Sequence, residues 1–260
     1  MRRSSVCAII PAAGHGSRLG LEIPKILAEI APGILVWDIL WARISEHVDL
    51  IHVVLSPSGW ELFARHAGPQ ISSGRLTLSV QDEPTGMGDA IFGATSAWSE
   101  FESTLVIWGD QVNLSERTVA TTLGLHHKLG AVPARTMTVP LVPMKEPYVE
   151  YIFVGDRLDR IRLAREGDQC RPGGLSDIGI FCLSTTDLAE AWTGYVERPQ
   201  IGPRTGEVNF LPFLVYLTRE KGWAMNVVPV DDEKEACGVN TLDDLAFARA
   251  EYLRSQIIAP

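Results

Sequence analysis

The chain has 260 residues and a formal net charge of −9 at pH 7, and hydrophobic residues make up 46% of it. This length can bury the core of one large α/β domain or two small ones, and the acidic balance excludes the broad basic face that general nucleic-acid binding requires. No segment approaches the roughly 20 consecutive apolar residues of a membrane-spanning helix. The four cysteines are scattered and form no Cys-x-x-Cys pair, which favours free thiols in a reducing cytoplasm.

Strand and helix patterns alternate through the first half of the chain. The run Val6–Ile10 is apolar throughout, which is typical of a strand buried on both faces. The alternation predicts parallel strands joined by right-handed crossovers, with helices on both faces of the sheet. His126 and His127 fall on a helix and are predicted to face solvent rather than bind a metal. Strands are expected at 6–10, 50–55, 76–80 and 104–107, and helices at 35–44, 61–66, 88–98 and from a Ser115 cap to about 129.

The first strand leads directly into a turn of small residues, Ala12 to Arg18. Its glycines can present unhindered backbone N–H groups to a phosphate chain, and Arg18 and Lys25 can neutralise the charge that builds up during nucleotidyl transfer. The turn is not a Walker loop, because no lysine follows the glycines directly. It is not a dinucleotide fingerprint either, because its glycines are spaced one residue too wide. A strand-to-helix turn without a ligand is the alternative.

A different pattern begins after residue 134. Two strands at 149–154 and 157–163, separated by Gly155-Asp156, predict a β-hairpin with a type II′ turn. Further strands are expected at 177–183 and 224–230, a loop at 168–174, and helices at 187–195, 210–220 and 242–255.

Several polar residues directly follow predicted strands. Ligands of open α/β sheets bind outside the carboxyl ends of the strands, where the glycine turn, the segment from Gln81 and Asp110 all lie. A carboxylate such as Asp110 at a strand end is poorly explained as structure and well explained as a Mg²⁺ ligand. Taken alone, Asn240 is more readily a helix cap, a role that Thr241 could also fill, and Glu207 is as readily an acid at a helix start.

Four groups of residues along the chain form an ordered set. They are the glycine turn with Arg18 and Pro24-Lys25, the segment Gln81–Ala90, Trp108-Gly109-Asp110, and the late elements Gly206-Glu207 and Gly238-Val239-Asn240. In this order they resemble the sugar-1-phosphate nucleotidyltransferase family, and within it the uridylyltransferase domain of bacterial N-acetylglucosamine-1-phosphate uridylyltransferases. The resemblance implies an α/β fold: a Rossmann-like, doubly wound mixed sheet of the nucleotide-diphospho-sugar transferase type with a small β-hairpin sugar-binding subregion. It also implies one domain over 1–260, with a nucleotide-binding half at 1–130 and a sugar-phosphate-binding half at 131–260.

The same resemblance implies Mg²⁺-dependent transfer of a nucleotidyl group, with UTP as the favoured nucleoside triphosphate, to a sugar 1-phosphate or similar small acceptor. Pyrophosphate would be released. Neither a nucleic acid nor a membrane is an expected partner, and a homo-oligomer is allowed. Arg18 would bind the triphosphate, Lys25 would offset charge near the reacting phosphates, and Asp110 would be a catalytic metal ligand with Asn240 as the second ligand. The implied substrate-binding residues are Ala12, Ala13, Gly14, Gly16, Ser17, Gln81, Gly86 and Gly88 for the nucleotide, and Asp177 and Glu207 toward the acceptor.

Three departures from the family pattern leave the acceptor open. Met87 stands between two glycines where the family has a threonine. The Glu and Asn of the family's acetamido-sugar pocket fall near Leu163 and at Asp177, and Tyr148-Val149-Glu150 replaces Tyr-Gly-Arg. A site that hydrogen-bonds a group rejects analogues lacking it, so these exchanges predict a different substrate. The alternatives are transfer of CMP or GMP to another phosphate or phosphonate acceptor, and a nucleotide-sugar sensor without turnover.

Overall fold

The computed structural model describes residues 5–14, 20, 23–83, 85–129, 135–198 and 202–258. The strands are β1 Val6–Ala12, β2 Glu29–Ala31, β3 Ile34–Leu35, β4 Leu50–Leu55, β5 Leu76–Val80, β6 Ser103–Ile107, β7 Thr136–Pro143, β8 Val149–Val154, β9 Arg157–Leu163, β10 Leu175–Asp177, β11 Ile180–Ser184 and β12 Ala224–Pro229. The α-helices are α1 Val36–Ile44, α2 Pro57–His66, α3 Gly68–Ser72, α4 Met87–Gly93, α5 Thr95–Trp98, α6 Glu116–Leu129, α7 Leu188–Val196, α8 Phe210–Glu220 and α9 Leu242–Ile258. Short 3₁₀ helices are η2 Lys25–Leu27, η3 Ala164–Glu166 and η4 Glu233–Ala236.

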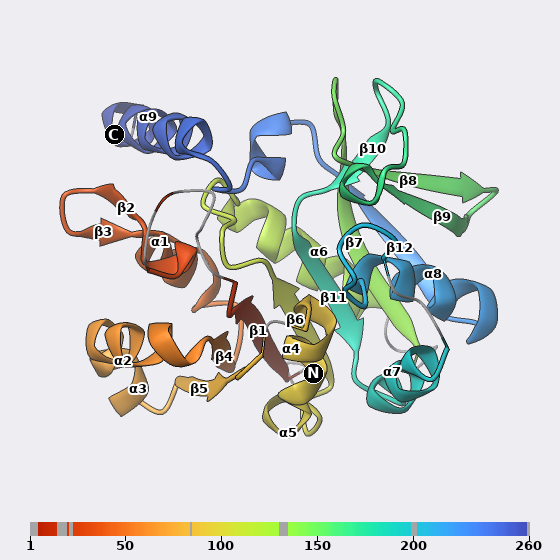
Figure 1. Ribbon diagram of the computed structural model, residues 1–260, viewed down its shortest axis with the longest axis horizontal. Coiled ribbons are helices and arrows are strands. Elements are labelled where there is room, and N and C mark those ends of the chain that lie inside the picture. The colour runs from red at the N-terminus through yellow and green to blue at the C-terminus, as the bar shows by residue number, and fades with distance from the viewer. Residues whose placement is uncertain are drawn as a thin grey trace.

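One ten-stranded sheet runs through the molecule in the order β5-β4-β1-β6-β11-β7-β10-β8-β9, and β12 pairs with β7. The strands β5, β4, β1 and β6 are parallel, whereas β11 is antiparallel to both β6 and β7. In Figure 1 the hairpin of β8 and β9 projects at the opposite end of the molecule from α1, α2 and α3. The predicted mixed α/β sheet is therefore confirmed.

The order of the strands places a topological switch point between β1 and β6. From β1 the chain adds β4 and then β5 on one side, and β6 returns to pair with β1 on the other side. Helix-covered open sheets bind their ligands at the carboxyl ends of the strands at such a point. The glycine turn follows β1 and Asp110 follows β6, so both predicted elements lie at this edge of the sheet.

Successive residues of the central strands point alternately into two separate hydrophobic cores. In β1, the side chains of Val6, Ala8 and Ile10 belong to the first core, and those of Cys7 and Ile9 belong to the second core. Side chains of α1, α2, α6 and α9 complete the first core, and side chains of α4, α5, α7 and α8 complete the second. Burial on both faces explains why β1 is apolar at every position.

Several elements have the predicted bounds, among them β4, β5, β8, β9 and α8. The hairpin turn has the predicted type as well. Gly155 has a φ of 60°. The φ of Asp156 is not positive, because Asp187 is the one non-glycine residue with positive φ among the described residues. A positive φ at the first loop position alone is the pattern of a type II′ turn.

Other boundaries differ from the prediction for local reasons. Helix α2 starts at Pro57 rather than residue 61, because the Ser56 hydroxyl accepts a hydrogen bond from the Gly59 N–H at 3.3 Å and Pro57 fits the first turn. The helix expected over 88–98 is interrupted at Ala94 between α4 and α5. The strand expected over 177–183 is divided into β10 and β11, because Gly179 takes a φ of 77°.

Two features around the middle of the chain were not predicted correctly. Strand β7 was not expected, because Pro140 and Pro143 argue against a strand with ladders on both sides. His126 was expected to face solvent, but it is buried, and its Nδ1 lies 3.1 Å from the Thr138 hydroxyl of β7. Burial, together with the neighbouring His127, lowers the pKa of His126 to about 4, so this histidine is a neutral core residue.

Gly88 in α4 packs against the ring of Trp192 in α7. A Cβ at position 88 would lie 2.1 Å from the Trp192 Cη2 atom. The indole cannot easily move, because it stacks on Phe92 at 4.5 Å and meets Phe213 edge-on at 5.1 Å. We therefore expect Gly88→Ala to reduce the free energy of unfolding by about 1–3 kcal/mol through overpacking. Urea denaturation would measure this loss.

Gly93 on the same helix is the matched control. It is exposed, and a Cβ there would meet nothing within 4 Å. Gly93→Ala should leave stability unchanged or raise it by about 0.5–1 kcal/mol, because alanine is the better helix former. Equal unfolding midpoints for the two variants would show that Trp192 accommodates the added methyl group.

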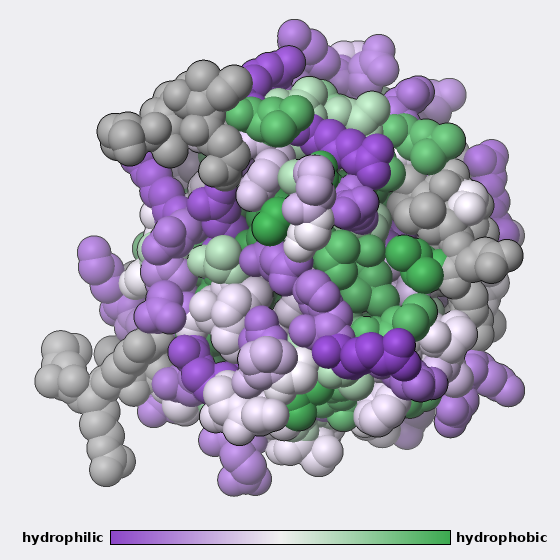
Figure 2. Space-filling model, turned by 90° about the vertical axis from the view of Figure 1, so that its left-hand side faces the viewer, coloured by the Kyte–Doolittle hydropathy of each residue, from purple (hydrophilic) through white to green (hydrophobic). Residues whose placement is uncertain are grey.

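The surface seen from the side of α9, α1 and α2 mixes charged and apolar residues. Figure 2 shows its apolar side chains in separate areas with polar residues between them. Exposed apolar residues of these helices include Trp60 and Leu62 in α2 and Leu242, Phe247 and Leu253 in α9.

None of the described helices combines the length and apolar character needed to cross a membrane. The four cysteines are free thiols, and burial raises the pKa of Cys7 to about 12.

Candidate active site

Three residues from distant parts of the chain meet at the carboxyl edge of the sheet. Lys25 begins η2, Asp110 lies three residues after β6, and Asn240 lies two residues before α9. The Lys25 Nζ lies 3.1 Å from Asp110 Oδ2 and 2.6 Å from Asn240 Oδ1. The Lys25 and Asp110 side chains keep 19% and 17% of their exposure, so the group is accessible to a ligand. Three of the predicted catalytic and metal-binding residues therefore form one cluster.

Backbone contacts hold the Asp110 loop against the segment that carries Asn240. The carbonyl of Asp110 accepts hydrogen bonds from the N–H groups of Val112 and Val239, both at 3.0 Å. A Cβ at position 238 would lie 3.0 Å from Asp110 Oδ1, so Gly238 allows the two segments to approach closely. The position of Asp110 thus depends on its main chain, which leaves its carboxylate for a ligand.

A buried glutamate strengthens the same connection. Glu235 of η4 accepts hydrogen bonds from the N–H and the hydroxyl of Ser115 and from the hydroxyl of Thr118, each at 3.0 Å. The Ser115 hydroxyl in turn accepts the N–H of Thr118 at 3.1 Å, which confirms the predicted N-cap of α6. Sequence analysis missed Glu235, whose side chain joins the start of α6 to the segment before Asn240.

Thr241, not Asn240, caps α9. The Thr241 hydroxyl accepts a hydrogen bond from the N–H of Asp244 at 3.2 Å. The Asp244 carboxylate accepts the N–H groups of Thr241 at 2.8 Å and Asn240 at 3.0 Å, which completes a reciprocal cap. The amide side chain of Asn240 is therefore not used for capping and points its oxygen at Lys25.

The described part of the glycine turn lies beside the end of β6. Ala12 and Ala13 are at least partly buried, whereas Gly14 is exposed. A Cβ at Gly109 would lie 3.1 Å from the Ala12 Cβ, which shows how closely the ends of β1 and β6 approach. The remaining predicted residues of this turn, Gly16, Ser17 and Arg18, lie outside the described residues.

The Gln81 segment forms a compact loop after β5. The Gln81 amide donates hydrogen bonds to the carbonyl of Gly86 and the hydroxyl of Thr85, both at 3.2 Å. Gly86 has a φ of 131°, a conformation that L-residues rarely adopt, and a Cβ there would lie 3.2 Å from the carbonyl of Val208. The segment that carries Glu207 is thus adjacent to this loop. Gly88 is buried against Trp192, so the structure shows a packing role for it, and its role in the nucleotide pocket stays a prediction.

Glu207 takes part in a polar network that the sequence analysis did not predict. Its carboxylate lies 3.2 Å from the guanidinium of Arg165, which also donates to the Asn209 side chain. Glu166 accepts hydrogen bonds from Asn209 at 3.0 Å and from the Thr205 hydroxyl at 2.6 Å. Burial opposes ionisation of Glu166, but these bonds and two backbone N–H groups lower its pKa to about 2. The network joins η3 to the segment 204–209.

The loop beside the hairpin is fixed by a second charged group. Glu150 of β8 has no exposed side-chain surface and accepts hydrogen bonds from Arg162 at 3.0 Å and from Arg171 at 2.6 Å. Although burial raises it, the pKa of Glu150 is lowered overall by these bonds and by the charge of Arg171. Glu150 is the third residue of Tyr148-Val149-Glu150, where the family pattern has the arginine of Tyr-Gly-Arg. In this protein Glu150 joins β8 to the loop of Arg171.

Asp177 ends β10 in a buried position. One carboxylate oxygen accepts the N–H of Gly179 at 2.9 Å, and the carboxylate lies beside the buried hydroxyl of Tyr151 in β8. Burial raises the pKa of Asp177 to about 6, although the Gly179 N–H and Tyr151 oppose the shift. A neutral carboxyl group can donate a hydrogen bond as well as accept one, as an asparagine amide does, whereas the ionised carboxylate only accepts, so this position differs chemically from the family pattern's asparagine when Asp177 is ionised.

The raised pKa predicts that Asp177 reduces stability at neutral pH. Its pKa in the folded protein exceeds the ordinary 3.8, so stability should fall as pH rises from about 4 through 6 and stay low above that. We expect Asp177→Asn to remove this fall and to be up to about 3 kcal/mol more stable than the wild type at pH 8. Urea denaturation across pH would measure it, with Asp156→Asn in the hairpin turn as the control. A parallel pH dependence in wild type and Asp177→Asn would contradict the prediction.

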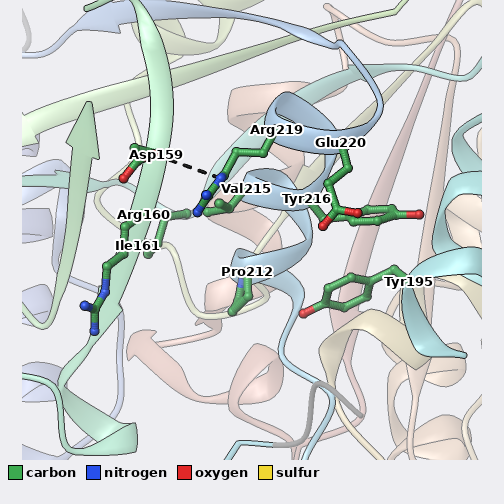
Figure 3. A pocket seen from close by; sticks show the side chains of 9 residues that line it. All are labelled: Asp159, Arg160, Ile161, Tyr195, Pro212, Val215, Tyr216, Arg219 and Glu220. Carbon is green, nitrogen blue, oxygen red and sulfur yellow. Dashed lines mark ion pairs between the residues drawn. The ribbon is translucent and has the colours of Figure 1, made fainter. Parts of the chain in front are cut away.

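A surface cavity lies between β9 and α8, and its lining includes none of the predicted site residues. Its volume is about 540 Å³. Figure 3 shows Asp159 of β9 facing Arg219 of α8, with an ion pair at 4.0 Å between them, whereas the Arg160 side chain points away from Arg219. Arg160 is paired with Asp168, and Glu220 is paired with Arg198. This cavity therefore lies apart from the residues that the sequence predicted for the site, and both of its arginines are paired with an aspartate.

The comparisons with known proteins agree with this geometry. Residues 8–170 match the family described as the MobA-like NTP transferase domain. The chain belongs to this family. The match covers more than half of the chain. It confirms the expected enzyme class, a nucleotidyltransferase, and the resemblance to the sugar-1-phosphate nucleotidyltransferase family.

Individual relatives extend the similarity beyond residue 170. The bifunctional protein GlmU of Carboxydothermus hydrogenoformans is 26% identical over 243 residues, which cover 92% of this chain and 51% of that protein. The chain therefore spans about half the length of the curated relatives it matches. A structure described as a glucose-1-phosphate thymidylyltransferase of Bacillus anthracis superimposes with a TM-score of 0.72 at 16% identity, with 95% of each chain covered. A 4-diphosphocytidyl-2C-methyl-D-erythritol synthase of Anaerococcus prevotii gives a TM-score of 0.67 at 16% identity, with 96% of each covered. These two structures confirm the fold.

Proposed function

We propose that this MobA-like NTP transferase is a Mg²⁺-dependent enzyme that joins a nucleoside triphosphate, UTP in the first instance, to a sugar 1-phosphate and releases pyrophosphate. The observation that carries the proposal is the meeting of Lys25, Asp110 and Asn240 at the switch point of the sheet. A cation beside two oxygen ligands, next to a glycine turn, suits the transfer of a charged phosphoryl group. The name of the thymidylyltransferase neighbour, which includes glucose 1-phosphate, supports a sugar 1-phosphate as acceptor.

The donor set fits magnesium. The Asp110 carboxylate and the Asn240 amide oxygen converge on one point, which Lys25 Nζ marks at 3.1 and 2.6 Å. Both are hard oxygen donors, and Mg²⁺ usually takes one or two protein oxygens and completes its shell with phosphate oxygens and water. Within the described ranges there is no cluster of three or more His, Cys, Asp or Glu residues that could hold a metal by itself. This composition favours an ion that is shared with the triphosphate.

The proposed reaction needs no side-chain nucleophile. An oxygen of the acceptor phosphate attacks the α-phosphorus and forms a new P–O bond. The bond from the α-phosphorus to the bridging oxygen breaks, and pyrophosphate leaves with the electron pair. When bound, Mg²⁺ would supply charge neutralisation on the phosphates and fix their orientation. Lys25 would place its ammonium beside the charge that develops, and Arg18 would bind the triphosphate as a bidentate fork.

The other predicted residues would position the two substrates. The main chain of Ala12, Ala13 and Gly14 would approach the nucleotide, and the Gln81 amide would contact the base. On the acceptor side, Glu207 already binds Arg165 next to Gly86, so this pair lies between the two predicted halves. We propose that Arg165 and Glu207 exchange hydrogen bonds with the acceptor when it binds, and that Asp177 contributes to the choice of acceptor.

The decisive experiment is a pyrophosphate-release assay. Purified protein with Mg²⁺ would be tested with ATP, GTP, CTP and UTP against a panel of sugar 1-phosphates, with Asp110→Asn as the inactive control. We expect release with UTP and one acceptor. Release with CTP alone would replace uridylyl by cytidylyl transfer, an alternative that the cytidyl product named for the Anaerococcus relative favours. Nucleotide binding without release across the panel would favour the nucleotide-sugar sensor.

A further inference from the structure

The ammonium group of Lys25 lies on the same two oxygen atoms that the proposed function assigns to the metal. Its Nζ is 2.6 Å from Asn240 Oδ1 and 3.1 Å from Asp110 Oδ2. In both contacts the ammonium donates a hydrogen bond to the oxygen. A divalent cation bound by these oxygens would have to occupy nearly the same position. The lysine and the metal therefore compete for one site.

We propose that Lys25 is an internal counter-ion of the nucleotide-free protein, and that a divalent cation binds tightly to Asp110 and Asn240 only when triphosphate oxygens draw the ammonium away. The inference rests on the proposed function, because it takes these two residues as the metal ligands. It adds a coupling between metal and nucleotide that the residue roles alone do not imply.

Packing fixes the main chain around Lys25, whereas its ammonium is held by two hydrogen bonds that a competing ligand can replace. Ile26 and Leu27 are buried in the first core, with 1% and 7% exposure. On the other side, Pro24 packs so closely on Gly59 that a Cβ there would lie 2.3 Å from the proline ring. The four-carbon stem of lysine can rotate between its rotamers without any change in these contacts. The ammonium can thus leave the two oxygens while η2 stays in place.

The partners of Lys25 are also fixed in their positions. Asp110 is held through its backbone by Val112 and Val239, and Asn240 is held through its N–H by Asp244. Neither side chain has to move to exchange one cation for another. When the ammonium leaves, the phosphate oxygens gain a cation and the Asp110 carboxylate gains the metal in the same exchange. Such a shared exchange makes the affinities for metal and triphosphate rise together.

Mn²⁺ binding to the nucleotide-free protein tests the proposal. Mn²⁺ replaces Mg²⁺ as the probe, and free Mn²⁺ is measured by electron paramagnetic resonance. We expect Lys25→Met to bind Mn²⁺ at least about tenfold more tightly than the wild type, and the additional change Asp110→Asn to abolish this gain. Lys221→Met removes the same charge from the end of α8 and should leave the affinity unchanged. Equal Mn²⁺ affinity of the wild type and Lys25→Met would overturn the proposal, as would a gain that survives Asp110→Asn.

A second measurement uses the wild-type protein, so it does not depend on the folding of a variant. The chain has five lysines, whose rates of acetylation by acetic anhydride can be followed separately by peptide mass spectrometry. We expect millimolar Mg²⁺ to raise the rate at Lys25 severalfold and to leave the rate at Lys221 unchanged. An unchanged rate at Lys25 under conditions where Mn²⁺ is bound would overturn the proposal. Neither measurement uses turnover, so a silent pyrophosphate assay together with metal competition at Lys25 would contradict only the proposed function.

Discussion

Asp110→Asn is expected to lower the rate of pyrophosphate release by at least about a thousandfold in Mg²⁺, because loss of the charge on this metal ligand weakens metal binding and removes several kcal/mol of transition-state stabilisation. Asparagine keeps the shape of the side chain and loses its charge. The Asp110 side chain contacts the Lys25 ammonium at 3.1 Å, and the loop itself is held by backbone hydrogen bonds. The free energy of unfolding should therefore change by no more than about 1 kcal/mol.

The measurement pairs initial rates with urea denaturation. Asp156→Asn in the hairpin turn makes the same chemical change outside the proposed site and should retain full activity. Near-normal turnover of Asp110→Asn in magnesium would contradict the metal assignment. A loss of activity that matches a loss of folded protein would make the effect of Asp110 structural rather than catalytic.

The fold was predictable where burial determines the composition of a segment. Strand β1 is apolar at every position because its neighbouring side chains enter two different cores. The Gly155-Asp156 turn was predictable because only a few residue pairs allow a type II′ hairpin. Strand β7 was not, since Pro140 and Pro143 lower its local strand propensity, and its stability comes from pairing with β10, β11 and β12. Such partners come from later parts of the chain, which a local pattern does not represent.

The site was predictable as a location but not as a set of contacts. Placing Asp110 after a strand and the glycine turn after another is enough to bring them to one edge of the sheet. The contacts of Lys25 with Asp110 and Asn240 were not predictable from a local pattern, because these two residues lie 85 and 215 positions away from it in the sequence. Gly88 illustrates the same limit. A glycine in this motif indicates that a large group lies close to the backbone. The structure shows that this group is the ring of Trp192.

Lys25→Met is expected to reduce kcat by about a hundredfold to a thousandfold while changing the KM for the nucleotide much less, because a cation that acts on developing charge stabilises the transition state more than the ground state. Methionine has a similar length and no charge, so it preserves the packing of the stem. The same variant should bind Mn²⁺ more tightly in the absence of nucleotide. A residue that served only as a structural ion pair would not combine weaker catalysis with stronger metal binding.

Steady-state kinetics with varied nucleotide separate the two constants, and titration calorimetry gives the affinity for the nucleotide directly. Lys221→Met provides the charge control, and Lys25→Arg tests whether a cation of different shape restores part of kcat. An unchanged kcat in Lys25→Met would return this lysine to the role of a surface ion pair near η2. A large rise in KM with kcat preserved would place its contribution in nucleotide binding, because the ammonium would then contact the triphosphate equally in the ground state and the transition state.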